Sequence, residues 1–405
     1  MSLILGATAV ASIASYLLIW LVPRQIGLEA YKDFGLFWAA MYFVVGALSG
    51  LQQEVTRGTV RRSDEIVPTV SPARNFGLAV SGIVFLAVVV SSPLWIGSVF
   101  PGEGWPLVLP LAFATTSYVM VATLAGTLYG IAGWVPLALM ISVDGVLRFV
   151  AVCLVASVTD DTVALAWAAA LPFLITIAVL WPGIRRVVVG KTALDVGYRA
   201  LSRNVAGTMV AAASMGVLVS GFPVVLGIAA AGEPAAFVAS LFLAITITRA
   251  PVIVVVMSLQ SYLIVRFRDH PGSFWRDFLA LQAIILGGAV VLSVLAWLVG
   301  AAVFDFLYGG QIDLDGWFYA ALVASSALVG CLAVTAPAVL ALSQHAVYSL
   351  GWVVAAIVTI GCFILPFDLM TNTVVSLLAG PVAGLLVHAP YLLIHRSRRI
   401  SAARA

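Results

Sequence analysis

Arg249 is a charged residue in the middle of a long apolar stretch. The run 235–265 contains no acidic residue, so Arg249 has no ion-pair partner within it. If the run crosses a membrane, an arginine near its centre costs roughly 2.5–3.5 kcal/mol on insertion scales and implies a partner, a water-filled cavity or a ligand. Arg249 therefore either faces a polar cavity or pairs with a carboxylate on another helix.

A second arginine inside an apolar run, Arg148, follows Asp144 by four residues. On a helix this spacing places both side chains on one face. They either form a local ion pair or both face a cavity, with Asp144 exchanging a proton beside Arg148. His388 is the only histidine well inside an apolar run, and it is either a hydrogen-bonded core residue or part of a proton relay.

Three further charged residues lie at the ends of apolar runs. Arg24 follows the run 2–23, and Glu54 and Arg57 follow the run 34–53. Each arginine either anchors its helix at a membrane surface, as terminal arginines commonly do, or adds positive charge to a binding site. Glu54 joins Asp144 and His388 as a candidate for proton or ion coupling.

Enzyme signatures are weak in this sequence. Val189 to Thr192 (VGKT) resembles the end of a phosphate-binding loop, but that motif requires glycine where Arg185 stands. The pair Asp160 and Asp161 is interpreted as a solvated connector rather than as a metal or base site for glycosyl transfer. Three cysteines, an odd number, support neither a disulfide framework nor a zinc site. We therefore predict a protein that is not an enzyme, with no catalytic residue, metal or cofactor.

The composition indicates which elements must position these residues. Of the 405 residues, 63% are hydrophobic and 9% are charged, whereas soluble domains carry roughly 25% charged residues. Apolar runs of about 20 residues cross the hydrocarbon core of a membrane as helices. We predict an all-α polytopic membrane protein with about twelve spans, at 2–23, 34–53, 76–97, 105–129, 131–157, 162–182, 205–230, 235–265, 278–304, 317–343, 346–366 and 373–394.

The basic residues predict the orientation, because cytoplasmic loops near span ends carry an excess of Lys and Arg. Of the 20 Lys and Arg residues, only Arg24 and Lys32 fall in predicted outer loops, and Arg148 and Arg249 fall within spans. The others lie in the predicted inner loops or the tail, so we expect a multi-pass protein of the cytoplasmic membrane with both termini in the cytoplasm. The net charge of +3 then reflects topology and contact with membrane lipids, and nucleic-acid binding is not needed to explain it.

The longest loops are too short for a soluble domain, so function must be built from helices. We predict an N-terminal six-helix lobe (1–183), a cytoplasmic basic linker (184–204), a C-terminal six-helix lobe (205–394) and a cytoplasmic basic tail (395–405). A shift of 200 residues aligns Pro23 with Pro223 and Gly27 with Gly227. This match indicates either an internal repeat, with a site between two facing lobes, or merely similar composition.

The first two predicted spans carry a family signature. The sequence has LVPRQIGLEAY at Leu21 to Tyr31, FGLF at Phe34 to Phe37 and GLQQEVTR at Gly50 to Arg57. These runs resemble the amino-terminal signature of polysaccharide-biosynthesis and O-antigen-type flippases of the multidrug/oligosaccharidyl-lipid/polysaccharide (MOP) exporter superfamily, which includes the MATE transporters. The resemblance covers residues 1–60 by motif, and the rest by span count, the basic linker and the segment 249–251.

The resemblance implies two six-helix lobes that open alternately to the two sides of the membrane. It also implies a cationic central cavity that binds the pyrophosphate of a polyprenyl-linked sugar, with Arg24, Arg57 and Arg249 at matching positions. Arginine suits this role because its planar fork donates two hydrogen bonds to phosphate oxygens and stays protonated.

We therefore expect a flippase for a lipid-linked saccharide, driven by an ion or by the membrane potential. Glycosyltransferases of a polysaccharide pathway would be its partners. Two alternatives remain. A MATE-like drug antiporter should need an acidic cavity, and a membrane-embedded glycosyltransferase or polymerase should turn over a lipid-linked sugar.

Overall fold

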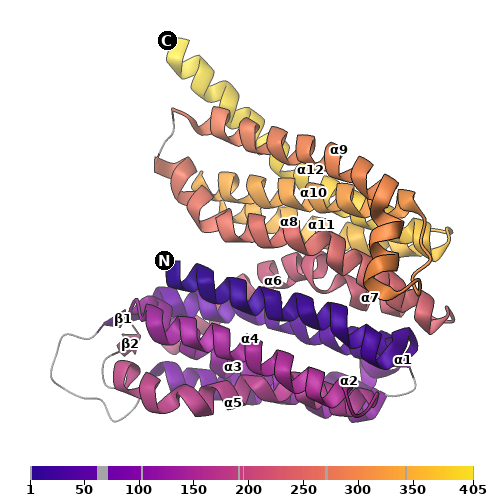
Figure 1. The fold of residues 1–405 in the computed structure, drawn as a ribbon. Coiled ribbons are helices and arrows are strands. Elements are labelled where there is room, and N and C mark those ends of the chain that lie inside the picture. The colour runs from indigo at the N-terminus through magenta and orange to yellow at the C-terminus, as the bar shows by residue number, and fades with distance from the viewer. Residues whose placement is uncertain are drawn as a thin grey trace. The chain divides into compact units, whose positions relative to one another are not determined.

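The computed structural model describes residues 2–61, 72–101, 104–189, 192–194, 196–269, 272–342 and 344–404. In these ranges the chain is helical almost throughout (Figure 1), which confirms the all-α fold class. The helices are α1 (Ser2–Gly58), α2 (Pro72–Val99), α3 (Gly104–Gly130), α4 (Trp134–Ala156), α5 (Thr162–Val188), α6 (Tyr198–Val219), α7 (Phe222–Ala229), α8 (Ala235–Asp269), α9 (Phe274–Tyr308), α10 (Gly316–Ala341), α11 (His345–Gly361), the 3-10 turn η1 (Cys362–Ile364) and α12 (Leu369–Arg404).

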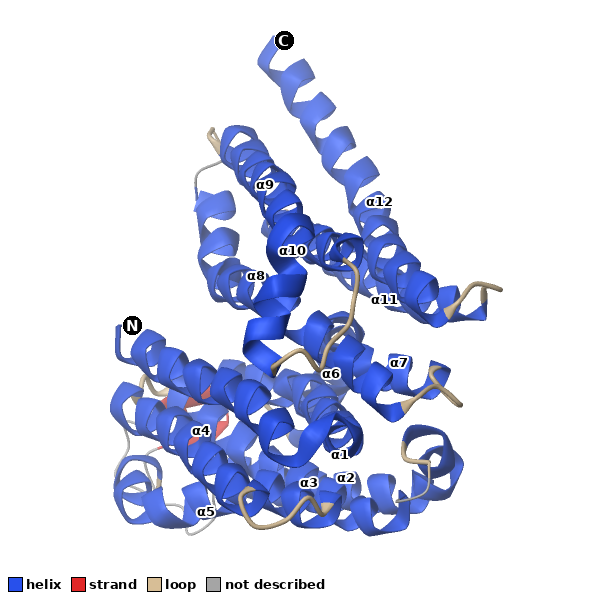
Figure 2. Ribbon diagram, turned by 45° about the vertical axis from the view of Figure 1, so that its right-hand side comes forward, coloured by secondary structure: helices blue, strands red, loops and turns tan. Residues whose placement is uncertain are grey.

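The strands are limited to one small ribbon in the described residues. Strand β1 (Thr59–Arg61) pairs antiparallel with β2 (Thr192–Leu194), and Figure 2 shows these two strands in red among the helices. The ribbon ties the segment after α1 to the segment after α5. The predicted inner loops after residues 53 and 182 therefore meet each other.

Helix α1 is long enough for two membrane crossings. Its 57 residues would extend roughly 85 Å if straight, far more than the ~30 Å of a hydrocarbon core. The helical geometry breaks at Gly27, whose φ of 80° and ψ of 163° suit a residue without Cβ. The predicted spans 2–23 and 34–53 both lie in α1, but the loop expected between them is wrong, because the chain stays helical on both sides of Gly27.

Nine helices of the described residues are long and apolar enough to cross a membrane, or ten if α6 and α7 are one bent span. These two helices meet at an angle of 63°, and together they occupy the predicted span 205–230. The predicted breaks near Gly130 and near His345 are present, between α3 and α4 and between α10 and α11. The chain is a multi-pass membrane protein.

The chain forms two compact units, unit 1 (Met1–Gly216) and unit 2 (Val217–Ala405). Most of α6 thus belongs to unit 1, whereas the sequence assigns its span to the C-terminal lobe. Helix α5 extends to Val188 and α6 begins at Tyr198, so the predicted linker 184–204 is largely structured. The predicted tail is helical as far as Arg404. The predicted division into lobes stays a prediction.

Unit 1 is a bundle in which α1 packs against α3 and α4, and α5 against α3 and α4 (Figure 1). Helices α1 and α4 approach closely where a Cβ on Gly145 would lie 2.8 Å from Ala11. Small residues at such contacts let membrane helices pack backbone to backbone. At another contact, Leu51 and Val55 of α1 share a core with Phe76 of α2 and Leu201 and Val205 of α6.

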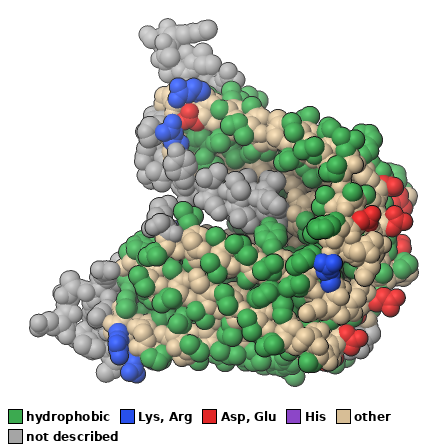
Figure 3. Space-filling view, in the orientation of Figure 1, with side chains coloured by type: hydrophobic (Ala, Val, Ile, Leu, Met, Phe, Trp, Pro, Cys, Tyr) green, Lys and Arg blue, Asp and Glu red, His purple; other side chains and the backbone are tan. Residues whose placement is uncertain are grey.

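Unit 2 is arranged around α10, which packs against α8, α9 and α12. Buried residues occur all along α10, from Phe318 to Val339, as expected for a helix that is apolar on every side. Helix α9 instead exposes large apolar side chains such as Ile284, Trp297 and Leu298. Figure 3 shows hydrophobic side chains spread over much of the visible surface, interspersed with other side chains and backbone. Such surfaces face lipid rather than water.

Candidate anion site

Arg249 lies in α8 within unit 2, and only 2% of its surface is exposed. Among the residues that the structure describes, its Nε and Nη1 atoms have no hydrogen-bond partner. The ion pairs found in the same ranges involve other side chains. Burying a guanidinium without acceptors for its donors is costly, so Arg249 is the candidate in this part of the chain for binding an anion.

The Arg249 guanidinium lies over the aromatic ring of Phe222. Its Cζ lies 5.8 Å from the ring centre of Phe222, within the ~6 Å range of cation–π attraction. Phe222 is fully buried and is the first residue of α7, directly after the bend that separates α6 from α7. Its ring also packs against Phe363 of η1, with ring centres 5.9 Å apart.

Arg148 in unit 1 is equally buried, at 2% exposed, but its donors are used. Its Nη2 donates to both carboxylate oxygens of Asp144, at 2.7 and 2.8 Å, and its Nη1 donates to the carbonyl of Ala169. The guanidinium also lies 3.9 Å from the ring centre of Phe173. The structure therefore contains the local ion pair that the sequence offered as one interpretation.

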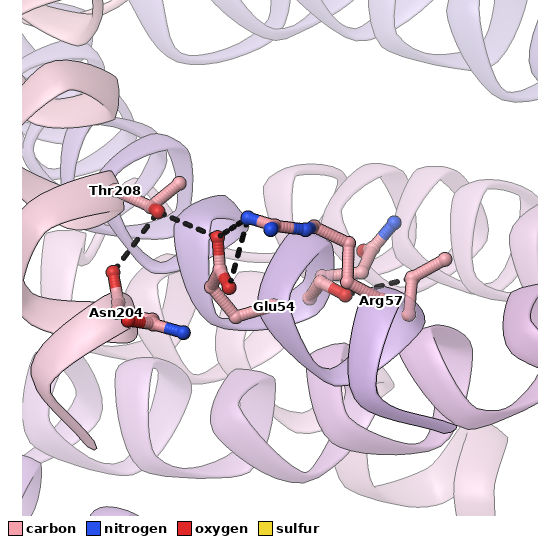
Figure 4. Close-up of polar contacts among 6 residues, drawn as sticks. Glu54, Arg57, Asn204 and Thr208 are labelled. Atoms are coloured by element: carbon pink, nitrogen blue, oxygen red, sulfur yellow. Dashed lines mark hydrogen bonds and ion pairs between the residues drawn. The ribbon is translucent and has the colours of Figure 1, made fainter. Parts of the chain in front are cut away.

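Glu54 and Arg57 meet near the end of α1 in unit 1 (Figure 4). Arg57 Nη1 lies 3.0 Å from Glu54 Oε1. The arginine side chain is 74% exposed and the glutamate 6% exposed. Glu54 Oε1 also accepts from the hydroxyl of Thr208 on α6, at 2.8 Å. This carboxylate thus joins α1 to α6 beside Gly50, where a Cβ would lie 2.8 Å from the backbone nitrogen of Met209.

The two remaining candidates lie in different surroundings. Arg24 is exposed on α1, with its guanidinium 5.1 Å from the ring centre of Trp20. His388 on α12 is fully buried in unit 2, and its Nδ1 lies 3.0 Å from the hydroxyl of Thr335 on α10. Gly351 of α11 leaves room for the ring, because a Cβ there would lie 2.1 Å from Nε2.

The structure thus pairs Arg57 with Glu54 and Arg148 with Asp144, whereas Nε and Nη1 of Arg249 have no acceptor among the described residues. In the described ranges, no group of three or more His, Cys, Asp and Glu residues could hold a metal ion. Asp161 accepts from the backbone nitrogens of Val163 and Ala164 and so caps α5. Phe222, Thr208 and Thr335 were not singled out from the sequence, because their roles arise from contacts between helices distant in the chain.

The fold is that of known membrane transporters. An inward-facing MATE-family multidrug resistance transporter of the MOP superfamily matches with a TM-score of 0.69 and 14% sequence identity, covering 96% of each chain. Lipid II flippase MurJ in an inward closed conformation also matches with a TM-score of 0.69 and 14% sequence identity, covering 98% of this chain and 88% of that one. The eukaryotic MATE transporter AtDTX14 matches with a TM-score of 0.65 and 13% sequence identity, covering 97% of this chain and 94% of that one. The chain is a polytopic membrane protein with this MATE- and MurJ-like fold.

Closer relatives are found by sequence, although no protein-family model matches. The chain is 33% identical over 392 residues to the uncharacterized protein Rv3630 of Mycobacterium tuberculosis (strain H37Rv), covering 94% of this chain and 89% of that protein. It is 30% identical over 394 residues to the uncharacterized protein Rv1510 of the same strain, covering 96% of this chain and 90% of that protein. The chain belongs to the family of these mycobacterial proteins.

Proposed function

We propose that the protein is a flippase that moves a saccharide linked to polyprenyl pyrophosphate across the cytoplasmic membrane by alternating access, for the synthesis of a cell-surface polysaccharide. The observation that carries this proposal is the buried guanidinium of Arg249 with two free donor atoms. A guanidinium binds phosphate oxygens through parallel hydrogen bonds and keeps its charge. A pyrophosphate group would supply the acceptors that Arg249 lacks.

The charge balance of the buried groups favours an anion over a cation as the substrate. Asp144 is paired with Arg148, and Glu54 with Arg57. No carboxylate among the described residues pairs with Arg249, so the described groups leave a positive charge at its position. A cation antiporter should present the opposite arrangement, with unpaired carboxylates. The fold alone does not distinguish these functions, because it occurs in proteins described as multidrug transporters and in one described as a lipid II flippase.

The remaining candidates take secondary roles in this proposal. Arg24 and Arg57 are exposed and stay candidates for substrate binding by unit 1, where Arg57 also pairs with Glu54 and Arg148 is held by Asp144. Asp144, Glu54 and His388 are the groups proposed for coupling to a proton or another ion. Glycosyltransferases in the cytoplasm would supply the substrate, and both termini would lie on that side.

Binding by the purified protein tests the proposal. The probes are a disaccharide linked to polyprenyl pyrophosphate and the same disaccharide linked to the polyprenyl chain by a neutral ether. We expect the wild-type protein to bind the pyrophosphate probe tightly and the ether probe weakly. Arg249→Gln should lose the binding of the pyrophosphate probe. Arg276→Gln, which changes an exposed arginine on α9, is the matched control and should bind normally. Equal affinity for both probes, or unchanged binding by Arg249→Gln, would contradict the proposal, and turnover of the probe would indicate a glycosyltransferase.

A further inference from the structure

We propose that Phe222 is the positioning residue of the anion site, and that its ring face holds the Arg249 guanidinium while leaving the donor edge free for pyrophosphate. This inference rests on the proposed function, since it takes Arg249 as the group that binds the substrate. The Cζ of Arg249 lies 5.8 Å from the Phe222 ring centre, and both residues belong to unit 2. Phe222 would act through Arg249 and need not touch the substrate.

A ring face is suited to hold an arginine that must bind something else. All guanidinium N–H groups point outward in its plane, so a hydrogen-bonding partner occupies donors, whereas a ring that attracts the cation through its negative face leaves them available. The ring also carries no net charge. It steadies the guanidinium without neutralising it, as a carboxylate would.

The same chain contains the contrasting arrangement. Arg148 lies over the ring of Phe173, but Asp144 and the Ala169 carbonyl also accept its N–H groups. That guanidinium is closed to a ligand. Arg249 has the ring contact, while Nε and Nη1 have no acceptor among the residues that the structure describes. The two buried arginines therefore differ in whether their N–H donors are occupied. Arg148 has a structural role, and Arg249 can bind a ligand.

Phe222 is also held in place by its own surroundings. It is fully buried, it follows Gly221 at the start of α7, and Pro223 comes next, where the fixed φ of proline suits the first turn of a helix. The ring of Phe363 packs beside it. A platform fixed in this way presents Arg249 in one orientation, so less freedom is lost when the anion binds.

Fluorinated phenylalanines at position 222 test this inference, because fluorine withdraws electron density from the ring face with little change in shape. The probe is geranylgeranyl pyrophosphate, and its Kd is measured on the full-length protein with mono-, di- and trifluorophenylalanine at 222. We expect a stepwise weakening that reaches roughly ten-fold, which corresponds to about 1.4 kcal/mol. Phe222→Leu keeps an apolar side chain but has no ring face, so it should bind less tightly than the wild type.

The same fluorinated series at Phe363 is the matched control, because this ring packs on Phe222 rather than under the guanidinium. We expect no trend there. Unchanged affinity along the Phe222 series, or an equal trend at Phe363, would overturn the role of Phe222. The Kd of Arg249→Gln for the same probe, measured in parallel, separates the role of Phe222 from the proposed function. Lost binding in that variant with a flat Phe222 series refutes only this inference, whereas retained binding refutes the proposed function.

Discussion

Buried Arg148 and partly buried Asp144 form an ion pair one helical turn apart on α4. Both carboxylate oxygens accept from a single guanidinium nitrogen, at 2.7 and 2.8 Å. The carbonyl of Ala169 on α5 accepts from the other terminal nitrogen. This pair therefore joins α4 to α5 within unit 1. Its partners leave the guanidinium little capacity for a substrate.

Breaking this pair should destabilise the protein strongly. Asp144→Ala leaves a buried arginine without its counterion, a change that typically costs about 3–5 kcal/mol. The double variant Asp144→Leu with Arg148→Met removes both charges and should recover most of the loss. Thermal unfolding of the purified protein in detergent measures the effect. A double variant no more stable than Asp144→Ala would contradict this account.

Gly351→Ala should disrupt the junction of α10, α11 and α12. The new Cβ would lie 2.1 Å from Nε2 of His388, and that ring is fixed by burial and by Thr335. We expect a large drop in melting temperature and partial rescue by adding His388→Ala. Gly361→Ala on the same helix is the control, because nothing lies within 4 Å of its Cβ position. Equal stability of the two single variants would refute the assigned contact.

Thr208→Val should loosen the attachment of α6 to α1. It removes the hydroxyl that donates to Glu54 while keeping the side-chain shape, and a lost hydrogen bond to a charged group costs about 1.5–3 kcal/mol. Ser214→Ala on the same helix removes only a bond to the helix's own backbone and should have a smaller effect. Hydrogen exchange of the α6 amides measures the difference. Identical exchange in both variants would argue against the role of Thr208.

Asp368 provides a pH-dependent contribution to stability outside the membrane spans. The hydroxyl and backbone N–H of Thr371 donate to its carboxylate and hold its pKa below the ordinary value, capping α12. Because the folded-state pKa is the lower one, the contribution is present above about pH 4 and is lost as the pH falls through the folded-state value. The stability difference between wild type and Asp368→Asn should therefore shrink on acidification. A difference that stays constant between pH 7 and pH 3 would disagree with this assignment.

Much of the helical architecture could be predicted from the sequence, because uncharged runs of membrane-crossing length have few alternatives to helix. The breaks near Gly130 and His345 were located correctly. The errors fall where a helix continues through polar residues, as in 24–33, and where it bends inside an apolar run, as at Gly221 between α6 and α7. Apolar composition gives no signal for such a bend.

The candidate site was only partly predictable for a related reason. The four-residue spacing of Asp144 and Arg148 offered their pairing as one of two interpretations, and the structure contains that pair. The pairing of Glu54 with Arg57 was not predicted, although their three-residue spacing on one helix could have indicated it. The lack of an acidic neighbour singled out Arg249, but the ring beside it comes from α7, across unit 2. A contact between separate helices leaves no spacing pattern in a single sequence, so Phe222 could be found only from the structure.

Translocation by the purified protein tests the central claim most directly. Liposomes are prepared with a fluorescent saccharide on polyprenyl pyrophosphate, with and without the protein, and a membrane-impermeant quencher reports how much probe has crossed the bilayer. We expect rapid crossing with the wild-type protein and the same rate with Arg276→Gln. With Arg249→Gln, we expect no more crossing than in protein-free liposomes. Failure of the wild type to move the probe, or movement by Arg249→Gln at the wild-type rate, would contradict it.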